Sequence, residues 1–110
     1  MNGTSKRIVW LHGEIKTPPF SLEARREIGR LIRRVQQGES VGMPLSRPMP
    51  SVGSRCHELR VRDEEHNWRL IYRIDTDAIL VLDIFAKTTR QTPRRVIDAC
   101  KSRIKIYDND

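Results

Sequence analysis

The hydrophobic positions of the chain change their period along its length, from helical spacing in the first third to alternation further on. Between Ser21 and Gly38 the apolar residues recur every three or four positions, as on one face of a helix. They are Leu22, Ile28, Leu31, Ile32 and Val35. Because Ser21 is a good N-cap and Gly38 a good stop, the pattern predicts one amphipathic helix of roughly 16 residues.

Three later segments have the pattern of β-strands. Residues Cys56–Arg62 and Trp68–Ile74 alternate between apolar and polar side chains. Residues Ala78–Ala86 are almost all apolar, which is typical of a strand that is buried on both faces. The polar stretch 63–67 and the pair Thr76-Asp77 are short enough to form hairpins, so the order predicts a three-stranded antiparallel meander.

The two ends of the chain complete an α+β fold. A short run rich in β-forming residues, Lys6–His12, predicts a first strand. Thr92 and Pro93 suit the N-cap and first residue of a closing helix, with Val96, Ile97, Cys100 and Ile104 on its inner face. We expect one domain over residues 1–110.

The segment 40–55 is predicted to be an irregular loop. Pro44, Pro48 and Pro50 cannot donate the hydrogen bonds of a central strand, and Gly42 and Gly53 indicate turns. Loops of this length in a small domain are often functional.

Alternation gathers arginines on one face of the predicted meander. Leu59 and Val61 must face the helices together with the apolar positions of 68–74, so the polar positions face the other way, uncovered. These positions hold Arg60, Arg62, Arg69 and Arg73. Like charges on neighbouring strands repel one another, which favours a bound anion, although pairing with Glu58 and Asp63 is the alternative.

The side of the sheet that Lys87 faces depends on the register of the last hairpin. A two-residue turn at Thr76-Asp77 would pair Arg69 near Ile84, so that Thr88 faces the arginines and Lys87 points away. A loop longer by one residue would instead bring Lys87 and Asp83 onto the arginine face. Both registers remain open at this point.

Composition adds a preference for a polyanionic partner. Lys and Arg number 21 against 14 Asp and Glu, a net charge of +7, and arginine predominates among the cations. Its planar guanidinium matches phosphate oxygens better than an ammonium does. The predicted helix also carries a row of arginines, interpreted either as a nucleic-acid stripe or as a solvated face: Arg25, Arg26, Arg30, Arg33 and Arg34.

Other classes of site receive little support. The two cysteines lack metal-ligand spacing and are expected to be reduced, and no metal or other cofactor is predicted. The stretch Met1–Arg7 is polar and no apolar run reaches the length of a membrane span, so we expect a cytoplasmic protein without a membrane partner.

Cations around a phosphate can promote RNA cleavage without a metal, because the ribose 2′-OH supplies the nucleophile. A general base would help. Glu58 lies on the arginine face and is the better candidate, or else a salt-bridge partner, whereas His57 faces the helices. His12 and His66 are assigned no role.

Several segments together resemble one toxin family. The sequences HELRVRD, NWRLIYRID and IFAKTTRQTP, with GEIKTPPFSLEARREIG and RPMPSVG before them, are similar to the phage-derived Gp49-like branch of RelE/HigB toxins. The resemblance implies a RelE-like fold and a ribosome-dependent mRNA endoribonuclease that inhibits translation. It also implies neutralisation by a helix-turn-helix antitoxin, with operator DNA as a partner through the antitoxin complex.

The resemblance also implies site residues. Family catalytic positions fall on basic residues of the sheet, here Arg60, Arg62, Arg69 and Lys87. We expect Arg60, Arg69 and Lys87 to act in catalysis with Glu58. The expected RNA-binding residues are Arg62, Arg73, Thr88 and Arg90.

One departure from the family pattern leaves other functions open. Relatives commonly read F-x-K-K-T where this chain has Phe85-Ala86-Lys87-Thr88-Thr89, so the second lysine is replaced by Thr88. Arg90 could supply the lost charge. The alternatives are a ParE-like gyrase poison and a non-catalytic, nucleic-acid-binding phage or repressor component.

Overall fold

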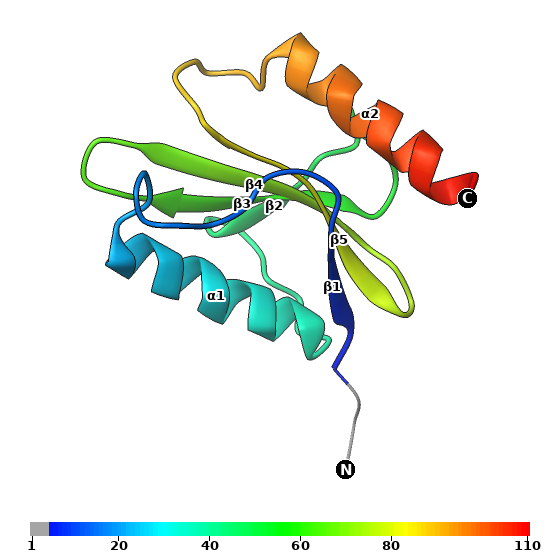
Figure 1. The fold of residues 1–110 in the computed structure, drawn as a ribbon, viewed down its shortest axis with the longest axis horizontal. Helices are drawn as coiled ribbons and strands as arrows, with labels where there is room; N and C mark the ends of the chain where they lie inside the picture. Colours follow the sequence, from blue (N-terminus) through cyan, green and yellow to red (C-terminus); the bar gives the residue numbers. More distant parts are fainter. Residues whose placement is uncertain (1–4) are drawn as a thin grey trace.

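A five-stranded mixed sheet separates two helices in the computed structural model, which describes residues 5–110 (Figure 1). The first four residues of the polar N-terminal stretch lie outside the described part. The helices are α1 (Leu22–Gln36) and α2 (Arg94–Asp108). The strands are β1 (Arg7–Trp10), β2 (Ser46–Pro48), β3 (Cys56–Arg62), β4 (Asn67–Ile74) and β5 (Ala78–Ala86), in the order β1-β5-β4-β3-β2. The predicted α+β class is confirmed.

The sheet is larger than the predicted three-stranded meander. β3, β4 and β5 pair antiparallel in chain order, but β1 adds to β5 in parallel and β2 adds to β3 at the other edge. The short β2 falls inside the segment predicted to be a loop. Its Pro48 lies opposite His57 on the outermost strand, where a missing N–H leaves no neighbour unpaired.

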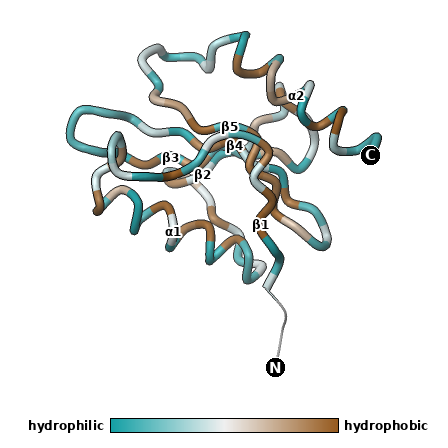
Figure 2. The backbone as a smooth tube through the Cα atoms, viewed as in Figure 1, coloured by the Kyte–Doolittle hydropathy of each residue, from teal (hydrophilic) through white to brown (hydrophobic). Residues whose placement is uncertain are grey.

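The two helices cover opposite faces of the sheet, so the expectation that one face is uncovered is wrong. Ile28 and Leu31 of α1 share a core cluster with Leu70 and Val81, whereas Val96 of α2 packs in a second cluster. β5 explains the difference, because its apolar residues alternate between the two clusters. Figure 2 shows the hydrophobic stretches of the central strands and the regular hydrophobic intervals along both helices.

The N-termini of the two helices are capped differently. The Ser21 hydroxyl accepts a hydrogen bond from the Ala24 N–H at 3.0 Å, as predicted for an N-cap. At α2 the N-cap is Pro93 and the helix begins at Arg94, one residue later than predicted. Thr92 does not cap the helix, because its hydroxyl donates instead to Glu58 at 3.0 Å.

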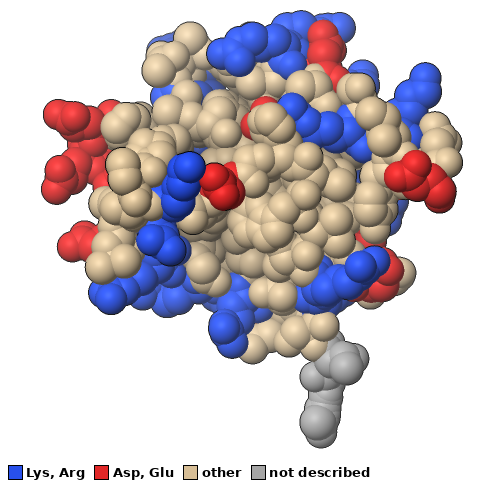
Figure 3. All heavy atoms as spheres, in the orientation of Figure 1, with Lys and Arg blue, Asp and Glu red and all other residues tan. Residues whose placement is uncertain are grey.

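The arginine row of α1 lies on the solvent side, where Arg30 pairs with Glu27 and Arg34 with Glu39. Figure 3 shows Lys and Arg atoms along the margins over α1 and over α2 rather than in a single patch. In the part of the chain that the structure describes, neither helix is long and apolar enough to cross a membrane.

A β-bulge decides the register of the last hairpin. The Asp75 N–H donates to the Ala78 carbonyl at 2.8 Å, which closes the tight turn at Thr76-Asp77. Further along, Tyr72 pairs with Val81 but Ile71 pairs with Asp83, so β5 has one extra residue at Leu82.

Because of this extra residue, the two-residue turn does not point Lys87 away from the arginines as expected. Arg69 lies opposite Phe85, one residue beyond the partner that the short turn alone would give it. Lys87 therefore lies on the same side of the sheet as Arg69, which is the outcome expected from a longer loop. The turn itself has two residues, and the bulge at Leu82 has the same effect on the pairing as a loop longer by one residue.

Candidate nucleic-acid interface

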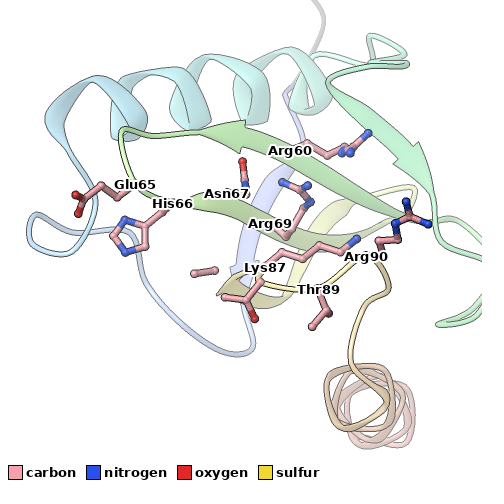
Figure 4. Close-up of a pocket in the computed structure, with 10 residues that line it drawn as sticks. Arg60, Glu65, His66, Asn67, Arg69, Lys87, Thr89 and Arg90 are labelled. Carbon is pink, nitrogen blue, oxygen red and sulfur yellow. The ribbon is translucent and has the colours of Figure 1, made fainter.

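An open groove of about 630 Å³ lies where the β3–β4 hairpin meets the chain that leaves β5 (Figure 4). Five of the predicted site residues line it: Arg60, Arg69, Lys87, Thr88 and Arg90. Glu65 and His66 lie at the opposite end of the groove from Arg90 in Figure 4. The groove therefore has a basic end and an end at the acidic hairpin.

Strand pairing explains how the cations meet. Arg60 and Arg69 are direct partners in the β3–β4 ladder, so their side chains leave the same face of the sheet. The Lys87 N–H donates to the Asn67 carbonyl at 2.8 Å, which continues the β4–β5 pairing by one more residue. Together with the bulge, this bond directs Lys87 into the groove.

Two of these cations are almost withdrawn from water. Arg69 and Lys87 each expose only 9% of their surface. Burial lowers the pKa of both groups, and Glu58 opposes that effect. The pKa of Lys87 is lowered further by the charges of Arg47, Arg69 and Arg60. The groove thus concentrates positive charge in a poorly solvated place.

The Glu58 carboxylate lies beneath the groove and does not line it. It is fully buried, with Oε1 at 3.2 Å from Arg47 Nε and 3.6 Å from Arg69 Nε. Its Oε2 accepts the hydroxyl proton of Thr92. These contacts favour the salt-bridge interpretation of Glu58 over that of an accessible general base.

Arg69 has an unused donor. Its Nη1 donates to the Trp68 carbonyl at 3.1 Å, but its buried Nε has no hydrogen-bond partner among the described residues. A buried donor without an acceptor costs about 1–3 kcal/mol. The nearest acceptor to Nε is Glu58 Oε1 beneath the groove, at 3.6 Å, which is an ion pair but too long for a hydrogen bond.

Two predicted RNA-binding residues lie elsewhere. Arg73 exposes 5% of its surface, and its guanidinium donates to Asp75 and Asp108 at 2.8–2.9 Å, so the expectation that it lies on an uncovered face is wrong. The end of α2 covers it, and the two carboxylates raise its pKa. Arg62 is exposed and lines a separate depression with Glu23 and other residues beside α1.

Sequence reasoning missed two residues of this region. Arg47 comes from β2, and the prolines around it concealed that strand. His66 lines the groove and stacks on Trp68 with ring centroids 4.9 Å apart. Its place in the hairpin beside β4 was the available signal. His57 stacks on Tyr72, and burial lowers the pKa of His57.

No three His, Cys, Asp or Glu side chains within residues 5–110 are placed to hold a metal ion together. The groove itself is lined by the cationic side chains of Arg60, Arg69, Lys87 and Arg90. They can bind a phosphate and stabilise negative charge that develops on it.

Comparison with protein-family models identifies a family for most of the chain. A family model described as phage derived protein Gp49-like (DUF891) matches residues 19–105. No curated protein matches the chain. The matched range includes every residue that lines the groove.

Proposed function

The chain belongs to the family of phage-derived Gp49-like proteins, and we propose that it is the toxin of a toxin–antitoxin system, a RelE/HigB-like endoribonuclease that cleaves mRNA on the ribosome. The observation that carries the proposal is the pair of buried cations, Arg69 and Lys87, at the groove. Arg69 is held there by its ion pair with the buried Glu58. This arrangement suits a phosphate in a strand of RNA.

The proposed chemistry needs no nucleophile from the protein. The ribose 2′-OH attacks the adjacent phosphorus, the O2′–P bond forms and the P–O5′ bond breaks, so that in sum the proton lost by the 2′-OH is gained by the departing O5′. Arg69 and Lys87 stabilise the charge that gathers on the phosphoryl oxygens. Arg60 and Arg90 bind neighbouring phosphates and fix the strand in line for attack. Glu58 holds Arg69 in place from below.

The proposed partner is a helix-turn-helix antitoxin that neutralises the toxin, and operator DNA would be contacted through the antitoxin complex. The net charge of +7 and the basic groove suit a partner with acidic segments. The ribosome is the site of action, which makes the cytoplasm the proposed location.

The test is controlled expression of the chain followed by mapping of mRNA 5′ ends. We expect growth arrest and new 5′ ends within translated codons. Arg60→Ala should lower cleavage by roughly 10²-fold, since it removes one charge contact to the substrate. Arg33→Ala, an exposed change on α1, is the matched control and should cleave like the wild type.

Three results would overturn the proposal. One is the absence of new 5′ ends, and another is undiminished cleavage in both Arg60→Ala and Arg69→Ala. The third is DNA damage with impaired supercoiling but intact mRNA, which would identify a ParE-like gyrase poison. A chain that binds RNA or operator complexes and never cleaves would be the non-catalytic component.

A further inference from the structure

A second groove, of about 380 Å³, lies between the proline-rich loop after β2 and the chain that leads into α2. Arg47 and Pro48 of β2 and Ser51 of the loop line one side. Arg90, Gln91 and Ile97 line the other. Of the residues that line this groove, the proposed cleavage uses Arg90 alone.

The two grooves are physically joined. Arg90 lines both of them. Arg47 of the second groove and Arg69 of the first contact the same oxygen of Glu58, at 3.2 and 3.6 Å. Thr92, also in the second groove, holds the other oxygen. One buried carboxylate therefore fixes the walls of both grooves relative to each other.

The second groove is lined by charged, apolar and polar side chains. Arg47, whose side chain is 37% exposed, and the exposed Arg90 supply positive charge. Pro48 and Ile97 supply apolar surface, and Ser51 and Gln91 supply polar groups. A single RNA strand has the complementary alternation of charged phosphates and flat bases with polar edges.

We infer that the second groove is a nucleotide subsite that receives the base and phosphate next to those in the first groove, on the same RNA strand. Arg90 and Arg47 hold the phosphate, and the base lies against the surface of Pro48 and Ile97. The inference rests on the proposed function, because it assumes RNA in the first groove.

The test measures binding of RNA oligonucleotides of two lengths by fluorescence anisotropy. A trinucleotide fills the first groove, and a hexanucleotide extends into the second, with 2′-O-methyl riboses to prevent cleavage. Ser51→Trp fills the second groove from the loop, and Gln91→Trp fills it from the other wall. Ser54→Trp is the matched control, because Ser54 is exposed on the same loop and lines neither groove.

We expect the wild type to bind the hexanucleotide at least tenfold more tightly than the trinucleotide. Ser51→Trp and Gln91→Trp should each remove this advantage and leave trinucleotide binding unchanged, and Ser54→Trp should behave like the wild type. Since the two filling variants act from opposite walls, misfolding of one leaves the other as the test.

The failures can be told apart. If the trinucleotide binds and needs Arg69, but the longer RNA gains nothing or neither filling variant alters its affinity, the subsite is refuted and the proposed function stands. If neither RNA binds, both are refuted. If a poly-glutamate peptide binds and RNA does not, and Ser51→Trp blocks the peptide, the groove belongs to a protein partner.

Discussion

Glu58 is a fully buried carboxylate beneath the groove cations, and it contacts Arg47, Arg69 and Thr92 at once. Its negative charge offsets the mutual repulsion of Arg47, Arg69 and Lys87, whose positive charges lie close together with little access to water. The same charge opposes the lowering of the Lys87 pKa by burial. The stability of the free protein and the shape of its groove both depend on this residue.

Glu58→Gln should lower the free energy of unfolding by about 3 kcal/mol, because it leaves buried cations without their counter-ion. The amide can still accept the Thr92 hydroxyl, so the loss is chiefly one of charge. Urea denaturation measures the change, and added phosphate should restore part of it by binding between the cations. Glu65→Gln, an exposed change in the hairpin, should stay within about 0.5 kcal/mol of the wild type.

Lys87→Met should stabilise the protein by about 1 kcal/mol near neutral pH and abolish cleavage, because it removes a buried charge that serves the substrate. Burial lowers the pKa of Lys87 below its ordinary value of 10.5, so the unfolded chain binds more protons as the pH rises toward that value. The free energy of unfolding of the wild type therefore increases as the pH rises through this range, because the cost of burying a charged Lys87 disappears.

Urea midpoints of the wild type and Lys87→Met should accordingly converge as the pH rises from neutral toward 10.5. Lys101→Met, an exposed change on α2, provides the control and should track the wild type at every pH. A constant gap between wild type and Lys87→Met would contradict the assignment.

At the level of single residues, alternation predicted that Arg60 and Arg69 share one face of the sheet, because the facing of a strand residue depends on local pattern. It did not predict that Glu58 joins Arg47 and Thr92, which lie far from it in the sequence and depend on tertiary contacts. The burial of Arg73 was missed for the same reason, since its partner Asp108 comes from the last turn of α2.

The β3–β4 hairpin and α1 are tied together by Asp63. Its carboxylate accepts the Ser21 N–H at 2.9 Å, the Glu64 N–H at 2.9 Å and the Trp68 indole N–H at 3.3 Å. These bonds, that from Ser21 first, lower the pKa of Asp63 from 3.8 to about 2. The N-terminus of the helix and the loop at the groove are thus held by one side chain.

Asp63→Asn should be less stable than the wild type above pH 4, and the difference should vanish as the pH falls from 3.8 to about 2. The folded-state pKa is lowered, so the contribution of Asp63 is present above the ordinary pKa and is lost by protonation below it. Thermal unfolding across this range measures the effect. Asp98→Asn, an exposed change on α2, should show no such convergence.

The C-terminal end of α2 is held to the sheet by Arg73, which bridges Asp75 and Asp108. Arg73→Ala should lower the free energy of unfolding by about 2 kcal/mol and increase hydrogen exchange in the last turn of α2. Arg62→Ala should change stability by less than about 0.5 kcal/mol, because Arg62 is exposed. Equal effects of the two changes would refute a structural role for Arg73.

At the level of elements, periodicity located both helices and four of the five strands. It failed where long-range contacts decide the outcome. The edge strand β2 exists only because β3 offers it a free edge, and α2 covers the face that Leu80 and Leu82 present. A bulge leaves no signal in an almost uniformly apolar segment such as β5.

The charge of the whole molecule is divided between faces, since α1 and the groove lie on opposite sides of the sheet. RNA in the groove should therefore contact about four cations and not the row on α1. The logarithm of the binding constant should fall with the logarithm of salt concentration with a slope of about −3, since each phosphate contact to a single strand contributes about −0.7.

Salt titrations of the variants locate the contacts that set this slope. Arg60→Ala should make the slope shallower by about 0.7. Arg33→Ala should leave it unchanged, because that side chain lies on the solvent side of α1. A steeper wild-type slope that depends on Arg33 would place the RNA on the helix instead.

The extra residue at Leu82 decides which side chain after Phe85 enters the groove. Two adjacent lysines at positions 87 and 88 would place one ammonium there with or without a bulge in β5. This chain has Lys87 alone, followed by Thr88. Closure of the bulge at unchanged strand length would pair Arg69 with Ile84 and turn Lys87 toward α1, whereas loss of Leu82 would keep Arg69 opposite Phe85 and Lys87 in the groove.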